Sequence, residues 1–346
     1  MLYRECRFRA AYTLFQEVKP DIKQSEVFQI LGGITTSVYM YPIHKLKLYI
    51  MAGASEKLRI ENFFDQFALD PHKLDIEQFL SEPADFEQYF YILPITAEML
   101  NSRSFSHVDT SFLGCSFAMI GEYNREEQRL YLPHLGESDK DWLDVAALLT
   151  MNEFSNELMG RYVVYRIAKK ELYTNPVLAA CIDRPFRELV LENLSNVIHG
   201  LEVPEKYKGV RGEEAYGLMI RHFGQLKQLL EQPDHPPHYE QAMKYYRIQC
   251  SYLRTFIMSG TDHFYRGEFI DSLRQLAVCD PGFQLDMHTK CWQKAANIWR
   301  RIGRNLLQLY YKLDPVRLDG LILQLEQLRE LEMQGMKELY QSLEGR

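Results

Sequence analysis

Cys6 is the residue of this sequence whose type and position best fit a chemical role. It lies just before the segment 7–18, RFRAAYTLFQEV, whose apolar residues recur at helical spacing. A thiol at a helix N-terminus loses its proton readily, because the positive end of the helix stabilises the thiolate. Arg4, Arg7 and Arg9 add positive charge nearby. Cys6 is therefore a candidate nucleophile, and the alternative is a small apolar residue buried near the terminus.

A nucleophilic cysteine also needs a base and hydrogen-bond donors for a developing oxyanion. Two histidines are candidates for the base: His107, in the segment SHVDT, and His134, which follows RLYLP. Either one would act only if its loop brings the imidazole to within about 3 Å of Cys6. The alternative for both is an exposed loop histidine. The backbone N–H groups of Cys6 and Arg7 are candidate oxyanion donors.

The sequence gives no sign of a metal site or a cofactor. The six cysteines are scattered without a CxxC pair, so neither a zinc site nor a disulfide framework is indicated. The segment HPPH (235–238) has two histidines, but its prolines favour an extended surface loop and no third ligand is near. Gly32 and Gly33 lack the rest of any phosphate-binding loop pattern. We therefore expect no bound metal and no cofactor.

The composition of the chain argues against several classes of protein. The chain has 346 residues, enough for about two domains, and 46% of them are hydrophobic. The formal net charge of -7 argues against a nucleic-acid-binding protein, although Lys294, Arg300, Arg301 and Arg304 cluster; that cluster is interpreted as a solvated helix face. No apolar stretch approaches ~18 residues, so no membrane span is expected. The charged start MLYRECRFRAAYTL is unlike a signal peptide, and we expect the protein in the cytoplasm.

Helix and strand patterns divide the chain into two parts. Ser25 is the expected N-cap of a short helix that ends at Gly32 and Gly33. Further helices are expected at 55–68, 75–81 and 141–154, and strands at 35–43, 46–53, 89–95, 115–123 and 129–135, with a hairpin loop at 124–128. From about residue 155 helical periodicity dominates. We therefore predict an α+β protein with domains at 1–155 and 156–346.

The C-terminal part contains two long helical patterns. The segment 284–312 has Trp292, Trp299 and several aliphatic residues on one face. The segment 315–343 repeats leucines, so it either closes a helical bundle or packs against a second subunit. A homodimer is the second of these options.

The order of these elements resembles the butirosin-biosynthesis protein H-like family, which joins a papain-like domain to a helical domain. Four segments carry the resemblance: Cys6 and its helix followed by Ser25-Glu26-Val27-Phe28 and the glycine pair; FAMIGEYNREEQRLYL (117–132); GEEAYGLMIRHFGQL (212–226); and HFYRGEFIDSLRQLA (263–277) with AANIWRRIGRNL (295–306). The resemblance is spread over most of the chain.

The resemblance implies a function in natural-product biosynthesis. In such an enzyme a cysteine, here Cys6, takes an acyl group from an acyl or peptidyl carrier protein and transfers it to a small-molecule amine. The family's histidine belongs at the start of the strand CSFAMIG, where this chain has Cys115 or Ser116, and the family's acid falls near Pro133. The alternative is therefore a member without catalysis that binds the carrier protein or an intermediate.

The resemblance also implies residues that contact the substrate. They are Ser25, Gly32, Gly33 and Cys115, together with His263 and Arg266, which would help to form a pocket or else cap and solvate their own helix.

Overall fold

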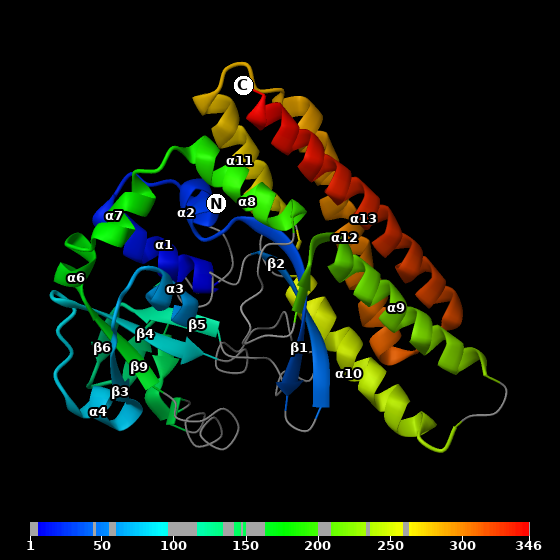
Figure 1. Cartoon of the computed structure of the whole chain (residues 1–346). Coiled ribbons are helices and arrows are strands. Elements are labelled where there is room, and N and C mark those ends of the chain that lie inside the picture. Colours follow the sequence, from blue (N-terminus) through cyan, green and yellow to red (C-terminus); the bar gives the residue numbers. More distant parts are fainter. Residues whose placement is uncertain are drawn as a thin grey trace. The chain divides into compact units, whose positions relative to one another are not determined.

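The computed structural model describes the chain outside a few segments; the described residues are 6–43, 46–54, 60–95, 116–133, 142–146, 148–149, 163–199, 209–232, 236–258 and 263–345. The chain forms two compact units (Figure 1). Unit 1 comprises residues 1–27 and 57–183, and unit 2 comprises residues 28–56 and 184–346. The boundary predicted after residue 155 marks a change in sequence pattern. The two units are instead defined by which residues are in contact, and each unit takes two separate stretches of the chain.

Unit 1 combines short helices with two antiparallel sheets. One sheet has the strand order β3-β9-β4-β5 and the other has the order β6-β7-β8. The elements are α1 (Cys6–Val18), α3 (Ile60–Gln66), β3 (His72–Asp75), α4 (Ile76–Ser81), β4 (Tyr89–Ile95), β5 (Ser116–Ile120), β6 (Glu122–Asn124), β7 (Arg129–Tyr131), β8 (Trp142–Asp144), β9 (Val163–Ala168), α6 (Lys169–Tyr173) and α7 (Pro176–Ile182).

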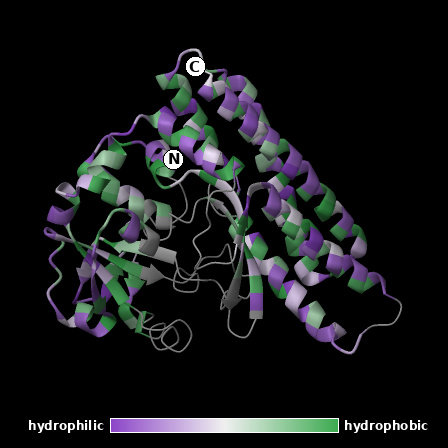
Figure 2. Ribbon diagram, in the orientation of Figure 1, coloured by the Kyte–Doolittle hydropathy of each residue, from purple (hydrophilic) through white to green (hydrophobic). Residues whose placement is uncertain are grey.

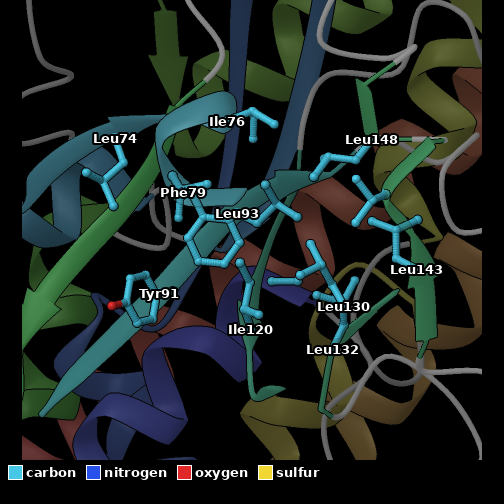
Figure 3. Close-up of a cluster of buried hydrophobic side chains, with 13 residues drawn as sticks. Leu74, Ile76, Phe79, Tyr91, Leu93, Ile120, Leu130, Leu132, Leu143 and Leu148 are labelled. Carbon is cyan, nitrogen blue, oxygen red and sulfur yellow. The ribbon is translucent and has the colours of Figure 1, made fainter. Parts of the chain in front are cut away.

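Both faces of the four-stranded sheet are buried, and the alternation of side chains along its strands separates them. Tyr91 and Leu93 of β4 point into a cluster that also takes in side chains from α4, β5, β7, β8 and β9 (Figure 3). Ile92, between them, is equally buried but belongs to the other face. On that face Tyr165 of β9 lies 5.1 Å from Phe64 of α3, measured between ring centroids. Strands β4, β5 and β9 are accordingly apolar at nearly every position, whereas the edge strand β3 contributes only Leu74 to the core.

Helix α1 is attached to unit 1 by its apolar face. Leu14 and Phe15 are fully buried, and the ring of Phe15 lies 5.5 Å from that of Phe67. The helix packs against β5 and α3. Its first residue, Cys6, is therefore held at one end of a helix that lies on the sheet.

Unit 2 is mostly helical. Its three-stranded antiparallel sheet has the order β10-β1-β2. The elements are α2 (Gln24–Ile30, which bridges the sequence boundary of the two units), β1 (Ile34–Ile43), β2 (Leu46–Ala54), α8 (Phe186–Ile198), β10 (Gly209–Arg211), α9 (Gly212–Glu231), α10 (Tyr239–Ile257), α11 (Arg266–Cys279), α12 (Leu285–Tyr311) and α13 (Pro315–Glu344).

The long helices of unit 2 are amphipathic and bury one face each. Figure 2 shows hydrophobic and hydrophilic residues alternating along α9, α10 and α13. Trp292 and Trp299 of α12 are fully buried, and α12 packs against α10, α11 and α13. The leucines of α13 face α9, α12 and α8, so this helix closes the bundle of its own chain.

The predicted fold class is confirmed at the coarse level: the chain is a mixed α+β protein with small antiparallel sheets and a helical C-terminal part. Most of the predicted elements are present, and the hairpin loop at 124–128 joins β6 to β7 as expected. The helix at 284–312 is α12.

Three details of the prediction are wrong. Ser25 is not the N-cap of α2 but its second residue, because the helix begins at Gln24. Residues 142–144 form a strand rather than the start of the predicted helix, since Leu143 pairs with Leu130 of β7 and both side chains are buried in the cluster. Residues 145–146 and 148–149 are helical, as predicted. The strand expected at 115–123 is divided at Gly121, whose N–H bonds to the carbonyl of Tyr131.

The sequence prediction also missed β9, which lies between β3 and β4 in the sheet. The segment VVYRIA is strand-like by itself, but it follows the point at which helical periodicity begins to dominate. Among the described helices, none combines the length and apolarity that a membrane crossing requires.

Gly53 of β2 allows a close approach that a larger residue would prevent. A Cβ atom there would lie 2.5 Å from the carbonyl oxygen of Phe264 and 2.7 Å from its Cγ, and Phe264 is fully buried. We predict that Gly53→Ala destabilises unit 2 by about 1–3 kcal/mol, because backbone must move. The measurement is urea unfolding followed by tryptophan fluorescence in a Trp142→Phe background, in which both remaining tryptophans lie in unit 2.

The matched control is Gly320→Ala in α13. A Cβ atom at this helical position meets nothing within 4 Å, so alanine should stabilise the same transition by about 0.5–1 kcal/mol. Equal unfolding midpoints for Gly53→Ala and the parent protein would show that the approach to Phe264 is not close.

Candidate functional site

The candidate nucleophile Cys6 is the first residue of α1. The first N–H groups of a helix have no partner within the helix, and they carry the positive end of its dipole. A 13-residue helix therefore provides the electrostatic environment that favours a thiolate at this position. The side chains of Cys6 and Arg7 lie outside what the structure describes, so this statement concerns the backbone.

His107, His134 and Cys115 all lie outside the described residues. Strand β5 begins at Ser116, which confirms that the position next to Cys115 is the start of a strand. Since α1 packs against β5, the helix that begins at Cys6 and the strand that begins at Ser116 are neighbours in unit 1.

The glycine pair ends α2 and lies beside a buried network of polar side chains. Gly32 and Gly33 have φ values of 93° and 61°, in the left-handed region that glycine tolerates. Asn193 donates from Nδ2 to the backbone oxygen of Gln29 at 2.8 Å and to its Oε1 at 2.9 Å, and Gln29 donates to Ser272 at 2.9 Å. A Cβ atom at Gly33 would lie 2.6 Å from the Gln29 Oε1 atom. A glycine is therefore required at position 33, because a larger residue would clash with the hydrogen-bonded side chain of Gln29.

The other predicted substrate contacts lie in separate parts of the chain. Ser25 of α2 is buried. His263 is partly buried and begins a run of three non-glycine residues with left-handed backbone: His263, Phe264 and Tyr265 have φ values of 63°, 54° and 62°. Such a run stores strain, and the surrounding structure must hold it in place.

Arg266 follows this run and makes the most extensive set of polar contacts in unit 2. Its side chain is fully buried. Nε donates to Glu332 Oε1 at 2.8 Å, and Nη2 forms a second, short bond to Glu332 Oε2. This two-bond geometry is the strong form of an arginine–carboxylate pair.

The remaining donors of Arg266 hold backbone and hydroxyl oxygens. Nη1 donates to the carbonyl of Phe264 at 2.6 Å, and the carbonyls of Thr35 and Gly53 lie 3.4 Å away. Nη2 donates to Thr36 Oγ1 at 2.8 Å. All the N–H groups of the guanidinium thus point at protein acceptors. Arg266 joins β1, β2 and the left-handed turn, and it has no donor left for a ligand.

Glu332 receives hydrogen bonds from three further elements. Trp299 Nε1 of α12 donates to Oε1 at 2.8 Å, the Tyr216 hydroxyl of α9 donates to Oε2, and Thr36 Oγ1 lies 3.3 Å from Oε2. Burial, together with the Glu332 carboxylate, raises the pKa of Tyr216 well above its usual value. The tyrosine therefore stays protonated and donates its hydrogen to the carboxylate.

Sequence reasoning missed Glu332, Tyr216 and Thr36 as parts of this centre. One signal was present: Glu332 lies four residues from both Leu328 and Met336, on the buried face of α13. A charged residue at such a position needs a buried partner. The sequence does not say which of the many arginines supplies it.

His222 of α9 lies within a second, aromatic cluster. Its ring centroid is 4.8 Å from that of Tyr49, 5.0 Å from that of Tyr246 and 6.2 Å from that of Tyr245. Burial lowers the pKa of His222 to about 4, and its Nε2 has no hydrogen-bond partner among the described residues. The Tyr245 hydroxyl donates to the carbonyl of Lys47 at 3.0 Å. The imidazole is therefore held neutral.

Neither cluster has the composition of a metal centre. Within the described segments, no group of three or more histidine, cysteine or acidic residues is arranged to hold a metal ion. Of the HPPH segment, His235 lies outside the described residues, and His238 occupies the N-cap position of α10 without a side-chain hydrogen bond to the helix.

The chain matches no protein-family model, and no curated protein matches it in sequence.

Breaking the buried ion pair should destabilise unit 2 strongly. We predict that Arg266→Met and Glu332→Leu each cost about 3–5 kcal/mol, because each leaves a buried charge without its counter-ion. The double variant should cost at least about 2 kcal/mol less than the sum of the two. Urea unfolding in the Trp142→Phe background measures all three.

The control is the exposed pair of Arg274 with Asp271, 2.7 Å apart. Arg274→Met should change stability by less than about 1 kcal/mol, since solvent screens an exposed pair. Additive effects of the two buried substitutions would contradict the coupling.

His222 should make unit 2 sensitive to acid. Its pKa is about 4 in the folded protein and about 6.5 when unfolded, so between these values only the unfolded chain binds the proton. The stabilisation is fully present above pH 6.5 and is lost as pH falls towards 4, by about 3 kcal/mol in total. His222→Phe should remove this part of the pH dependence of unfolding. An unchanged pH profile in the variant would contradict a buried neutral imidazole.

Proposed function

We propose that the protein is a cysteine-type acyltransferase of natural-product biosynthesis, with a papain-like catalytic domain in its N-terminal part. The Cys6 thiolate attacks the carbonyl carbon of the thioester of an acyl or peptidyl carrier protein, and the carrier sulfur leaves as a thiol with the proton that the protonated base supplies. The resulting Cys6 thioester is attacked by the nitrogen of a small-molecule amine. The amide forms, the Cys6 thiolate is released, and the amine proton passes to the base.

The observation that carries this proposal is the place of Cys6 at the start of α1, with α1 packed against β5. A nucleophile at a helix N-terminus is activated by the helix itself. Backbone N–H groups of the first turn are free of helical bonds, and they suit the oxyanion of the tetrahedral intermediate. The same arrangement supports the proposed papain-like domain, because a helix that begins with the candidate nucleophilic cysteine packs against an antiparallel sheet.

The base in this proposal is His107 or His134. Both are displaced from the start of β5, where the resemblance implies a histidine. A base in reach of the thiol contributes roughly 10²–10⁴-fold to the rate. His107→Ala and His134→Ala therefore identify the base, since only one of them should lower acyl transfer by that factor.

A second function is favoured by a specific observation: β5 begins at Ser116, the preceding residue in the sequence is Cys115, and neither is a histidine. Loss of one member of a catalytic set removes most of its rate enhancement. On this proposal the chain binds the carrier protein or its acyl intermediate without turnover.

Further parts of the proposal concern where and with what the protein acts. We place it in the cytoplasm, with a carrier protein and a small-molecule amine as partners. Substrate contacts are proposed at Ser25, Gly32, Gly33, Cys115 and His263. A homodimer is a further proposal, which sedimentation of the pure protein tests.

Thiol labelling distinguishes the two functions. We predict that iodoacetamide at pH 6 modifies Cys6 at least about tenfold faster than the exposed Cys279, because a lowered pKa leaves more thiolate. Peptide mass spectrometry follows both thiols in one sample. An acyl N-acetylcysteamine thioester, used as a carrier surrogate, should then acylate Cys6 in the parent protein and in Cys279→Ser but not in Cys6→Ser.

A second outcome would contradict the acyltransferase proposal. If Cys6 is labelled no faster than Cys279 and takes up no acyl group, Cys6 is not the nucleophile of an acyltransferase. Binding of a carrier protein that is unchanged by Cys6→Ala would then support the non-catalytic function.

A further inference from the structure

Four positively charged side chains share the exposed face of α12. Lys290, Lys294, Arg301 and Arg304 are all exposed, whereas Trp292 and Trp299 on the opposite face are buried. At 100° per residue these four positions fall within a sector of about 80°, and they extend over about 21 Å. We call this set the α12 stripe.

The charges of the α12 stripe are not neutralised within the described part of the protein. None of the four side chains makes an ion pair or hydrogen bond with another described residue. Some other cations of unit 2 do have partners: Lys227 bonds to Asp319 at 2.6 Å, and the exposed Arg274 bonds to Asp271 at 2.7 Å. Single exposed cations such as Arg221, Lys244 and Lys337 also lack an ion pair among the described residues, so the distinguishing feature of the α12 stripe is that four unpaired cations share one narrow sector of one helix.

The α12 stripe costs stability rather than adding to it. Lys290 and Lys294 are four residues apart and Arg301 and Arg304 three apart, and like charges at these spacings destabilise a helix by a few tenths of a kcal/mol. The helix dipole does not explain them, because the last turn of α12 has no basic residue. An unfavourable set of charges that the fold does not use suggests a role in binding.

The surroundings of the α12 stripe favour a protein as its partner. Exposed Met287 and Tyr311 lie at its two ends. Arginine, methionine and tyrosine are enriched in protein interfaces, whereas acidic residues and lysine, the other residue type of the α12 stripe, are depleted there. No acidic residue of α12 follows Asp286.

Other anionic partners fit less well. The apolar face of α12 is buried in the bundle, so the helix has no face to place in a lipid surface. The chain has a net charge of -7, and residues 57–183 contain 21 acidic residues against 11 basic ones, so a long polyanion is repelled overall. A compact partner protein with one acidic face can contact the α12 stripe alone, so the net negative charge of the chain opposes its binding less.

We propose that the α12 stripe is a docking surface for an acidic face of a partner protein. Its charges steer the encounter and fix the orientation of the partner, while Met287 and Tyr311 supply apolar contact at the ends. The proposal concerns unit 2 alone and does not depend on the chemistry of Cys6.

The test measures binding of a fluorescein-labelled six-residue poly-L-glutamate peptide, which spans about 20 Å when extended and so matches the length of the α12 stripe, to the full chain by anisotropy. We expect binding at 50 mM NaCl that weakens at least tenfold at 300 mM, because salt screens exposed charges. The variant with Lys290, Lys294, Arg301 and Arg304 all changed to Gln should bind at least tenfold more weakly at 50 mM. Circular dichroism confirms that it is folded.

The control removes four exposed cations at other places. Changing Lys170, Arg221, Lys244 and Lys337 to Gln alters the net charge equally and should change affinity by less than threefold. An equal loss in both variants would overturn the proposal. So would absence of binding to the parent protein, stripe-dependent preference for a 20-base-pair DNA duplex or for phosphatidylserine vesicles, or stripe-dependent self-association in sedimentation.

Discussion

The bond between Arg266 and Glu332 is the constraint on which unit 2 depends. Two charges in a fully buried place are stable only when every donor and acceptor finds a partner. Here the partners come from β1, β2, α9, α12 and the left-handed turn, so the pair joins most of the elements of the unit. Satisfying one carboxylate therefore fixes the relative positions of several helices and strands.

This constraint extends to the surface of α12. Trp299 must face Glu332 to donate its N–H, and its ring packs 4.3 Å from that of Phe264, measured between centroids. With the rotation of α12 fixed in this way, the positions of the α12 stripe can only point outwards. A rigid helix that presents charges at fixed spacing loses little conformational freedom on binding, which is what a docking surface requires.

Unit 1 is stabilised in a different way from unit 2. Its four-stranded sheet is buried on both faces, and its stability comes from apolar packing rather than from a polar centre. The helix that begins at Cys6 covers one of these faces and is held by Leu14 and Phe15. The reactivity proposed for Cys6 depends on where the first turn of this helix is held, so packing in the middle of α1 bears on chemistry at its end.

The sequence by itself determined most of the local elements, among them the helix that follows Cys6, because helix and strand periods are properties of neighbouring residues. It also determined that α12 has one apolar and one charged face. Only the tertiary structure decided that Arg266 pairs with Glu332, which is 66 residues away, and that Thr36, 296 residues from Glu332, joins them. It likewise decided that residues 163–168 form a strand inside the sheet. Such pairings depend on which distant groups share a buried space, and no local pattern records that.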